Sequence, residues 1–258
     1  MIRSVIAGKS GSGKTSLLMY LLLEPDMLDY DKLVVCARSL RQPEYEVLRE
    51  ALQHNLSKSQ IRTMFESQDE INKIGGIAQA LDHYDGPTYG GITGEFLSDP
   101  KLLRDPNEEN SAKKSIYVFD DVLNSPHQHN VASFFSRGRH AGVSSFYLAQ
   151  NYWLLDRRTI RENANLFFLF RQDHRSVVNI FQDHVGSDDI SLEQFRAFCR
   201  HCWSETHSFL TIDLTRDRNC GKYRKNLTEF WTPNVHPSSF VEGPGTSAPE
   251  YTGDEKQH

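Results

Sequence analysis

The chain has 258 residues, of which 38% are hydrophobic and 24% are charged, and its formal net charge is −5. This length suits one α/β domain with additions, and the net charge excludes a protein coated in basic surface while leaving room for a local cationic lining. No stretch approaches the roughly 18 apolar residues of a membrane span, and a strand is expected from residue 2, so we expect neither a membrane span nor a signal peptide.

A glycine-rich loop follows the first predicted strand. Residues 2–7 are a short, mostly apolar run typical of a buried strand, and residues 15–23 carry apolar side chains at helical spacing until Pro25. Between them, residues 8–15 read GKSGSGKT, an unbroken G-x-x-x-x-G-K-[ST] motif. Strand, loop and helix together are the setting that this motif requires.

The loop predicts a site for a nucleoside triphosphate and Mg²⁺. Its glycines permit close backbone approach, and the exposed N–H groups at the helix N-terminus form a nest for phosphate oxygens. Lys14 would reach the β- and γ-phosphates, and the Thr15 hydroxyl would ligate Mg²⁺. The expected nucleotide-binding residues are Gly8, Lys9, Ser10, Gly11, Ser12, Gly13, Lys14, Thr15 and Ser16.

After the first helix, the chain is predicted to form a second strand and a second helix before its pattern becomes irregular. Residues 32–36 predict a second strand, and a helix is expected from residues 41–43 to about Gln53. Residues 54–114 are the least regular part: polar amphipathic stretches around 58–66 and 69–83 precede a Gly/Pro-rich turn at 85–91. We interpret 54–114 as an insertion or helical cover with mobile loops.

A second chemical landmark is a hydrophobic strand that ends in two carboxylates. Residues 115–119 are followed by Asp120 and Asp121, as in a Walker B element, although a strand that ends in an Asp-rich turn is the common alternative. Asp120 would hold Mg²⁺, and Asp121 would orient or deprotonate the attacking water. The guanine-specific Asn-Lys-x-Asp motif is missing, since Asn72-Lys73 is followed by Ile74-Gly75, so ATP is the expected nucleotide.

The remaining elements follow in close succession. Arg137 and Arg139 flank Gly138 at the end of an apolar helix, and a buried strand over 143–149 ends in Gln150. Cys199 and Cys202 have the spacing of a metal pair, but they fall in an apolar helical pattern without a second pair or two histidines, which favours core packing. Four scattered cysteines indicate a reducing compartment. The final strand is predicted over 208–213, and a disordered tail over 232–258.

The order and spacing of these motifs resemble the FtsK/HerA superfamily of DNA-pumping ATPases. The strings Phe-Asp-Asp (119–121), Gly-Arg-His (138–140), Leu-Ala-Gln-Asn (148–151) and Ile-Arg-Glu-Asn-Ala-Asn (160–165) most resemble the genome-packaging ATPases of poxvirus-like viruses, virophages and Polinton-type elements. The resemblance covers roughly residues 2–40 and 115–215. It implies a RecA-like P-loop NTPase of the ASCE type, with a central, mainly parallel sheet flanked by helices, occupying residues 1–231.

The resemblance also implies roles for individual residues. The strand of Gln150 would lie between the P-loop strand and the Walker B strand, so that Gln150 senses the γ-phosphate and the attacking water. Arg139 would reach the ATP of a neighbouring subunit, with Arg137 as the reserve candidate. Relatives usually carry Glu where Asp121 stands, which leaves direct base catalysis open.

The expected function is ATP hydrolysis by a motor that moves double-stranded DNA into a viral capsid. The implied partners are duplex DNA, further copies of the chain in a ring (hexamer or pentamer) and capsid or portal-vertex proteins, in the host cytoplasm, a viral factory or the virion. Two basic clusters are candidate DNA contacts, each with a solvated face as its alternative: Arg157, Arg158 and Arg161; and Arg216, Arg218, Lys222, Arg224 and Lys225. A related DNA-transfer motor and, from a different class, a monomeric nucleotide kinase remain alternative functions.

Overall fold

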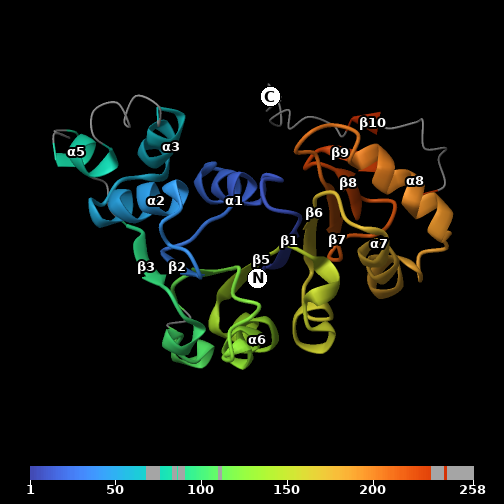
Figure 1. Ribbon diagram of the computed structural model, residues 1–258, viewed down its shortest axis with the longest axis horizontal. Helices are drawn as coiled ribbons and strands as arrows, with labels where there is room; N and C mark the ends of the chain where they lie inside the picture. The colour runs from blue at the N-terminus through green and yellow to red at the C-terminus, as the bar shows by residue number, and fades with distance from the viewer. Residues whose placement is uncertain (68–75, 83–85, 87–90, 110–111, 234–240, 243–258) are drawn as a thin grey trace, which may run out of the picture.

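One mixed sheet forms the centre of the protein (Figure 1). The structure is a computed structural model, and it describes residues 1–67, 76–82, 86, 91–109, 112–233 and 241–242. In this part of the chain the strand order is β10-β9-β8-β7-β6-β1-β5-β4-β2-β3. The strands from β6 to β3 run parallel: β1 (Arg3–Ala7), β2 (Lys32–Ala37), β3 (Thr93–Leu97), β4 (Ser115–Asp120), β5 (Val143–Ala149) and β6 (Leu166–Leu169).

An antiparallel extension continues the sheet beyond β6. It consists of β7 (Leu210–Asp213), β8 (Tyr223–Lys225), β9 (Glu229–Trp231) and β10 (Val241–Glu242). The prediction that 208–213 is the final strand is therefore wrong, because three strands follow it. These strands have only two or three residues each, which is too short for a visible alternation of apolar and polar positions.

Helices cover both faces of the sheet, as Figure 1 shows for α1, α2 and α3 on one side and α6 on the other. The first face carries α1 (Lys14–Leu23), α2 (Pro43–Gln53), α3 (Lys58–Glu66) and α5 (Ile77–Asp82). The second face carries α6 (Gln128–Ser136), α7 (His174–Ile180) and α8 (Leu192–Cys202). Short helical turns join them: η1 (Pro100–Leu102), η2 (Pro106–Glu108), η3 (Gly138–Ala141), η4 (Tyr152–Leu154), η5 (Arg157–Arg161) and η6 (Phe181–Val185).

Two hydrophobic cores lie on the opposite faces because side chains alternate along each strand. In β1, Ile6 packs under α1 and α2, whereas Val5 and Ala7 pack on the side of α6 and α8. The strand β4 divides in the same way, with Val118 on the first side and Phe119 on the second. Burial on both faces is what a parallel strand requires. The predicted fold class, a RecA-like α/β core with a mainly parallel sheet between helices, is confirmed.

The segment 54–114 is more regular than the sequence predicts. It supplies α3, α5 and the edge strand β3, which pairs in parallel with β2 from Lys32↔Thr93 to Cys36↔Leu97. The residues of β3, Thr-Gly-Glu-Phe-Leu, are exposed or half-buried, so the strand lacks the apolar run that marks a buried strand. Residues 69–75 and most of the predicted turn at 85–91 lie outside the described residues.

The predicted disordered tail is described only in part. Most of the predicted disordered tail, residues 234–240 and 243–258, lies outside the described residues, but Val241–Glu242 pairs with β9 and joins the sheet.

No helix in the described ranges is both long enough and apolar enough to cross a membrane.

Candidate nucleotide site

The P-loop connects the carboxyl end of β1 to α1, as its sequence predicts. Gly13 adopts φ 102° directly before α1, a left-handed conformation that favours glycine. Gly8 is required for a different reason: a Cβ at this position would lie 2.6 Å from the Phe170 Cβ and 2.6 Å from the Ser12 Oγ. The glycines therefore allow the loop to turn and to pack closely against the segment that follows β6.

The sheet register brings three functional segments to one edge. Ala7 pairs with Ala149, and Asp120 pairs with Leu148, so β1, β5 and β4 all end at the same level. Since parallel strands have their carboxyl ends on one side, the P-loop, Gln150 and Asp121 begin at this edge. The predicted position of the Gln150 strand, between the P-loop strand and the Asp120 strand, is confirmed.

A cavity of about 780 Å³ lies at this edge. Lys14, Thr15, Asp120, Asp121 and Gln150 all line it, together with Ser10, Gly11, Gly13 and Ser16. Of the remaining predicted loop residues, Lys9 is exposed, and Gly8 and Ser12 contribute through backbone contacts described below. The predicted site is thus assembled from three strands and one loop.

Lys14 is held over its own loop. Its Nζ donates to the carbonyl oxygens of Gly8, at 2.8 Å, and Lys9, at 3.0 Å. Burial lowers the pKa of Lys14, and the charges of Asp120 and Asp121 oppose that shift. The ammonium therefore lies in a partly desolvated position where phosphate oxygens would compete with two neutral carbonyls for it, and a charged acceptor makes the stronger hydrogen bond.

Asp120 is a buried carboxylate with incomplete compensation. It is 7% exposed, and burial raises its pKa, while hydrogen bonds from Tyr45 and the charge of Lys14 act in the opposite direction. The Tyr45 hydroxyl donates to Asp120 Oδ2 at 2.8 Å. Sequence reasoning gave Tyr45 no role. The available clue is that α2 follows β2, which neighbours β4, so its first turn lies at the same edge of the sheet.

The oxygen donors of Thr15 and Asp120 fit Mg²⁺, which binds through one or two carboxylates together with phosphates and water. No group of three or more histidine, cysteine or acidic residues in the described ranges can hold a metal by itself. Cys199 and Cys202 are buried in the core with raised thiol pKa values caused by burial, so core packing, the favoured interpretation, is confirmed.

Asp121 differs from Asp120 in exposure and backbone conformation. It is exposed and adopts φ 52°, a left-handed conformation that aspartate tolerates better than most residues. Such a strained position is common at functional sites. Asp121 and the exposed Gln150 both line the cavity, next to each other at the ends of β4 and β5.

His207 is a further site residue that sequence reasoning did not place. Its Nδ1 donates to the Ser12 carbonyl at 3.1 Å, and it lines the cavity beside Phe209 and Phe170. With φ 64°, His207 turns the chain immediately before β7. Its contact with the P-loop joins residues that are 195 positions apart, so no local pattern could indicate it.

Arg137 and Arg139 lie outside this cavity, at the amino end of β5. Arg137 Nη2 pairs with Asp105 at 3.0 Å. Arg139 is exposed and makes no ion pair with a carboxylate among the described residues. Burial and then the nearby charge of Arg139 lower the pKa of Arg3, so the neighbour of Arg139 is another cation. This position suits contact with an anion outside the subunit, but the role in a neighbouring subunit stays a prediction.

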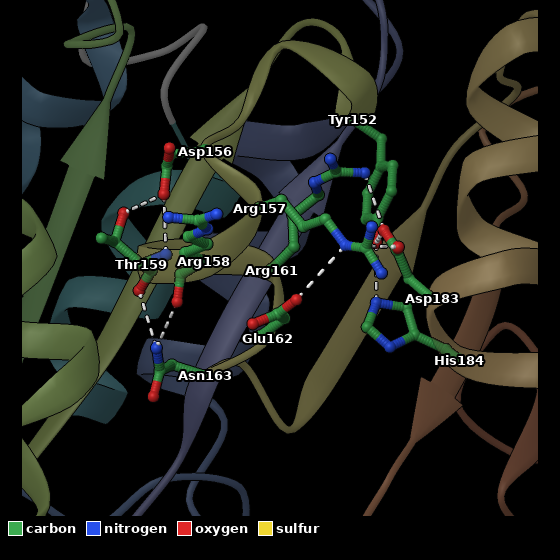
Figure 2. Close-up of polar contacts among 10 residues, drawn as sticks. All are labelled: Tyr152, Asp156, Arg157, Arg158, Thr159, Arg161, Glu162, Asn163, Asp183 and His184. Carbon is green, nitrogen blue, oxygen red and sulfur yellow. Dashed lines mark hydrogen bonds and ion pairs between the residues drawn. The ribbon is translucent and has the colours of Figure 1, made fainter.

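Most residues of the two predicted basic clusters pair with carboxylates; the exception is Arg158, which is exposed and forms no ion pair among the described residues. In the cluster at 157–161, Arg161 is 7% exposed and pairs with Asp183 at 2.7 Å, and Arg157 pairs with Asp183 and Glu162. Figure 2 shows Tyr152, Arg161 and His184 converging near Asp183. Arg161 is therefore a structural residue of the fold and cannot reach DNA.

The second cluster is corrected for the same reason. Lys222, Arg224 and Lys225 have nearly buried side chains that pair with Asp188, Asp213 and Glu205 at 2.6, 3.1 and 2.6 Å. The more exposed Arg216 and Arg218 pair with Asp213 and Asp189. Three of these partners, Asp188, Asp189 and Glu205, lie 20 to 34 positions away from the cations they bind, so the local sequence does not indicate them.

The fold and the convergent edge define a RecA-like P-loop core of the α/β class. The genome packaging NTPase B204 from Sulfolobus turreted icosahedral virus 2, in complex with AMPPCP, is 11% identical over 82% of this chain and 92% of that chain, with a TM-score of 0.48. VirB4 of Thermoanaerobacter pseudethanolicus is 10% identical over 83% of this chain and 87% of that chain, with a TM-score of 0.44. These likenesses are too distant to assign a function. No protein-family model and no curated protein matches the sequence.

Proposed function

We propose that this protein is an ATPase that hydrolyses ATP to move double-stranded DNA, and that it packages a viral genome into a capsid. The observation that carries the ATPase proposal is the convergence of Lys14, Thr15, Asp120, Asp121 and Gln150 on one cavity. The DNA and packaging parts rest on the motif strings at 119–121, 138–140, 148–151 and 160–165.

Each residue at the convergent edge has a task in the proposed reaction. Lys14 and the loop amides bind the phosphates. Thr15 and Asp120 would hold Mg²⁺, which neutralises charge on the β- and γ-phosphates when it is bound. Asp121 orients the attacking water or accepts its proton, and Gln150 contacts the same water from the neighbouring strand.

The proposed assembly is a ring of identical subunits, a hexamer or pentamer, that contacts capsid or portal-vertex proteins and acts in the host cytoplasm, a viral factory or the virion. The position of Arg139 supports the ring. It lies at the amino end of β5, whereas the nucleotide cavity lies at the carboxyl end. A neighbouring subunit is therefore the expected recipient of its charge.

The proposal is tested by measuring ATP hydrolysis with and without duplex DNA over a range of protein concentrations, with Lys14→Ala as the inactive control. We expect hydrolysis that rises with DNA and with subunit concentration. A concentration-independent enzyme that transfers phosphate to a nucleoside monophosphate, without a response to DNA, would instead be the monomeric kinase.

A further inference from the structure

A second group of arginines lies beside the nucleotide site without carboxylate partners. Arg171 precedes α7, Arg175 lies in its first turn, and Arg196 and Arg200 are one turn apart on α8. Among the described residues, none of the four forms an ion pair with Asp or Glu. No sequence pattern indicates them as a group, because the two pairs belong to different helical segments, with η6 between α7 and α8. We call these four residues the α7–α8 arginine surface.

Two adjoining cavities lie along three members of this surface. A cavity of about 200 Å³ lies between α7 and α8 and is lined by Gln172, His174, Val177, Arg196, Cys199, Arg200 and Trp203. Arg171 lines an adjacent cavity of about 280 Å³, and Trp203 borders both. Arg171, Arg196 and Arg200 therefore line two adjoining cavities, and Arg175, which lines neither, lies beside them in the first turn of α7.

The contacts that these arginines do make are with neutral or cationic groups. Arg175 stacks over the Trp153 ring, 3.9 Å from its centroid, and Arg196 Nη2 lies 3.3 Å from His174 Nε2. Stacking fixes the plane of a guanidinium while its N–H groups stay available for an oxyanion. The positive charge on this surface is oriented but not neutralised.

Few carboxylates lie near the α7–α8 arginine surface, and two of them already bind other groups. The Asp173 carboxylate accepts from the Ser176 N–H at the start of α7, and Glu205, which lines the adjacent cavity, pairs with Lys225. Glu193, in the first turn of α8, is the remaining carboxylate on these two helices. In a chain with a net charge of −5, four arginines beside so few free carboxylates make a strongly positive patch.

We propose that the α7–α8 arginine surface holds the phosphate backbone of duplex DNA. This inference rests on the proposed function, and it moves the main DNA contact away from the two predicted clusters, in which every residue except Arg158 pairs with a carboxylate. Planar guanidinium groups bind phosphate in a bidentate manner, and a row of phosphates matches a groove with several such groups. A protein partner would need a matching acidic face, whereas DNA carries a phosphate charge about every 1.7 Å of its axis.

Two segments connect this surface directly to the nucleotide cavity. Gln172 Nε2 donates to the carbonyls of Ala7, at 3.0 Å, and Phe170, at 2.8 Å. Phe170 lines the nucleotide cavity and packs on Gly8. Trp153, whose ring stacks against Arg175, follows Gln150 in the chain by three residues. The residues that neighbour the arginines are therefore in direct contact with the walls of the nucleotide cavity.

The segment with Trp153 is held firmly from its other side. The Tyr152 hydroxyl donates to Asp183 Oδ2 at 3.0 Å, and Arg161 Nη1 binds the same oxygen at 2.7 Å (Figure 2). Tyr152 therefore ties the segment between Gln150 and Trp153 to η6, which contains Asp183. DNA bound at the arginines would act on the ATP site through the same residues.

The test uses the full chain with a nonhydrolysable ATP analogue and a fluorescent duplex of mixed sequence. The variants are Arg196→Gln/Arg200→Gln on α8 and, independently, Arg171→Gln/Arg175→Gln at α7. The matched control is Arg216→Gln/Arg218→Gln, which removes the same charge from arginines that are paired with carboxylates. Circular dichroism confirms that each variant is folded.

We expect both test variants to bind the duplex at least about tenfold more weakly than the control. In a plot of the logarithm of the DNA association constant against the logarithm of the salt concentration, the slope should become less steep by about 0.9 for each phosphate that the variant no longer neutralises. Stimulation of ATP hydrolysis by DNA, relative to each variant's own basal rate, should fall in parallel. If the control binds the duplex weakly and the test variants bind it normally, the proposed surface is wrong.

Two other outcomes separate this inference from the proposed function. If the wild-type protein neither binds duplex DNA nor responds to it, the DNA motor itself is wrong. If the test variants bind DNA normally but form assemblies of altered mass, the arginines contact another protein chain, and the inference alone is overturned.

Discussion

His184 provides a quantitative test of the buried network that anchors the segment after Gln150. Its Nε2 lies 2.7 Å from the Tyr152 hydroxyl, and its ring centroid lies 4.3 Å from that of Phe167. Burial lowers the pKa of His184 from 6.5 to about 4; the charge of Asp183 opposes this shift, and the charges of Arg161 and Lys222 add to it. The imidazole is therefore neutral in the folded protein at pH 5 but protonated in the unfolded chain.

The sign and size of the effect follow from this difference. Between pH 4 and pH 6.5 the unfolded state binds the additional proton, so the contribution of His184 to stability is complete above pH 6.5 and declines as the pH falls. At pH 5, about 1.5 pH units below the unfolded pKa, the decline is about 2 kcal/mol at 1.36 kcal/mol per unit.

The assay is urea unfolding of the wild type and His184→Gln at pH 7.5 and pH 5, with His54→Gln, at an exposed histidine, as the control. We expect the stability advantage of the wild type over His184→Gln to shrink by about 2 kcal/mol between these pH values. A difference that is the same at both pH values would show that His184 is not buried in its neutral form, and the reasoning would be refuted.

Three further predictions concern the nucleotide site. Asp121→Asn should retain Mg-ATP binding but hydrolyse ATP at least roughly 10²-fold more slowly, whereas Asp120→Asn should raise the Mg²⁺ concentration needed for activity; identical loss of binding in both would contradict the division of roles between them. Tyr45→Phe removes a hydrogen bond that stabilises ionised Asp120, so the acidic limb of the kcat/KM profile should move to higher pH; an unshifted limb would show that Asp120 does not govern it. Mixing inactive Arg139→Ala and Lys14→Ala subunits should restore ATP hydrolysis, since an arginine supplied by a neighbour contributes roughly 10³–10⁵ in rate; if confirmed mixed rings stay inactive and Arg137→Ala complements instead, Arg137 is the residue that acts.

The nucleotide site could be predicted in large part because its chemistry is contiguous in sequence. The P-loop needs glycines and a lysine within eight residues, and Asp120 and Asp121 end an apolar strand, so both appear as local patterns. The resemblance to DNA-pumping ATPases then supplied the strand order that places Gln150 between them. These predictions required only short segments and a known topology.

The features that the sequence did not predict depend on contacts between residues that are distant in the chain, which a single sequence does not reveal. Tyr45 reaches Asp120 across 75 positions, and Lys222 reaches Asp188 across 34. A run of basic residues after β7 looks like a nucleic-acid surface in sequence, but it becomes a set of ion pairs once the antiparallel strands pack against their neighbours. The short strands β8, β9 and β10 were missed because pairing, rather than composition, makes them strands.

The central claim is that ATP hydrolysis at the convergent edge drives movement along double-stranded DNA. The most direct measurement is displacement of a labelled third strand from a triplex by the assembled wild-type protein, with Asp121→Asn as the matched control. The account predicts displacement that requires ATP, depends on duplex length ahead of the triplex and is abolished in Asp121→Asn. ATP hydrolysis by a DNA-bound assembly with no displacement of the third strand would contradict it.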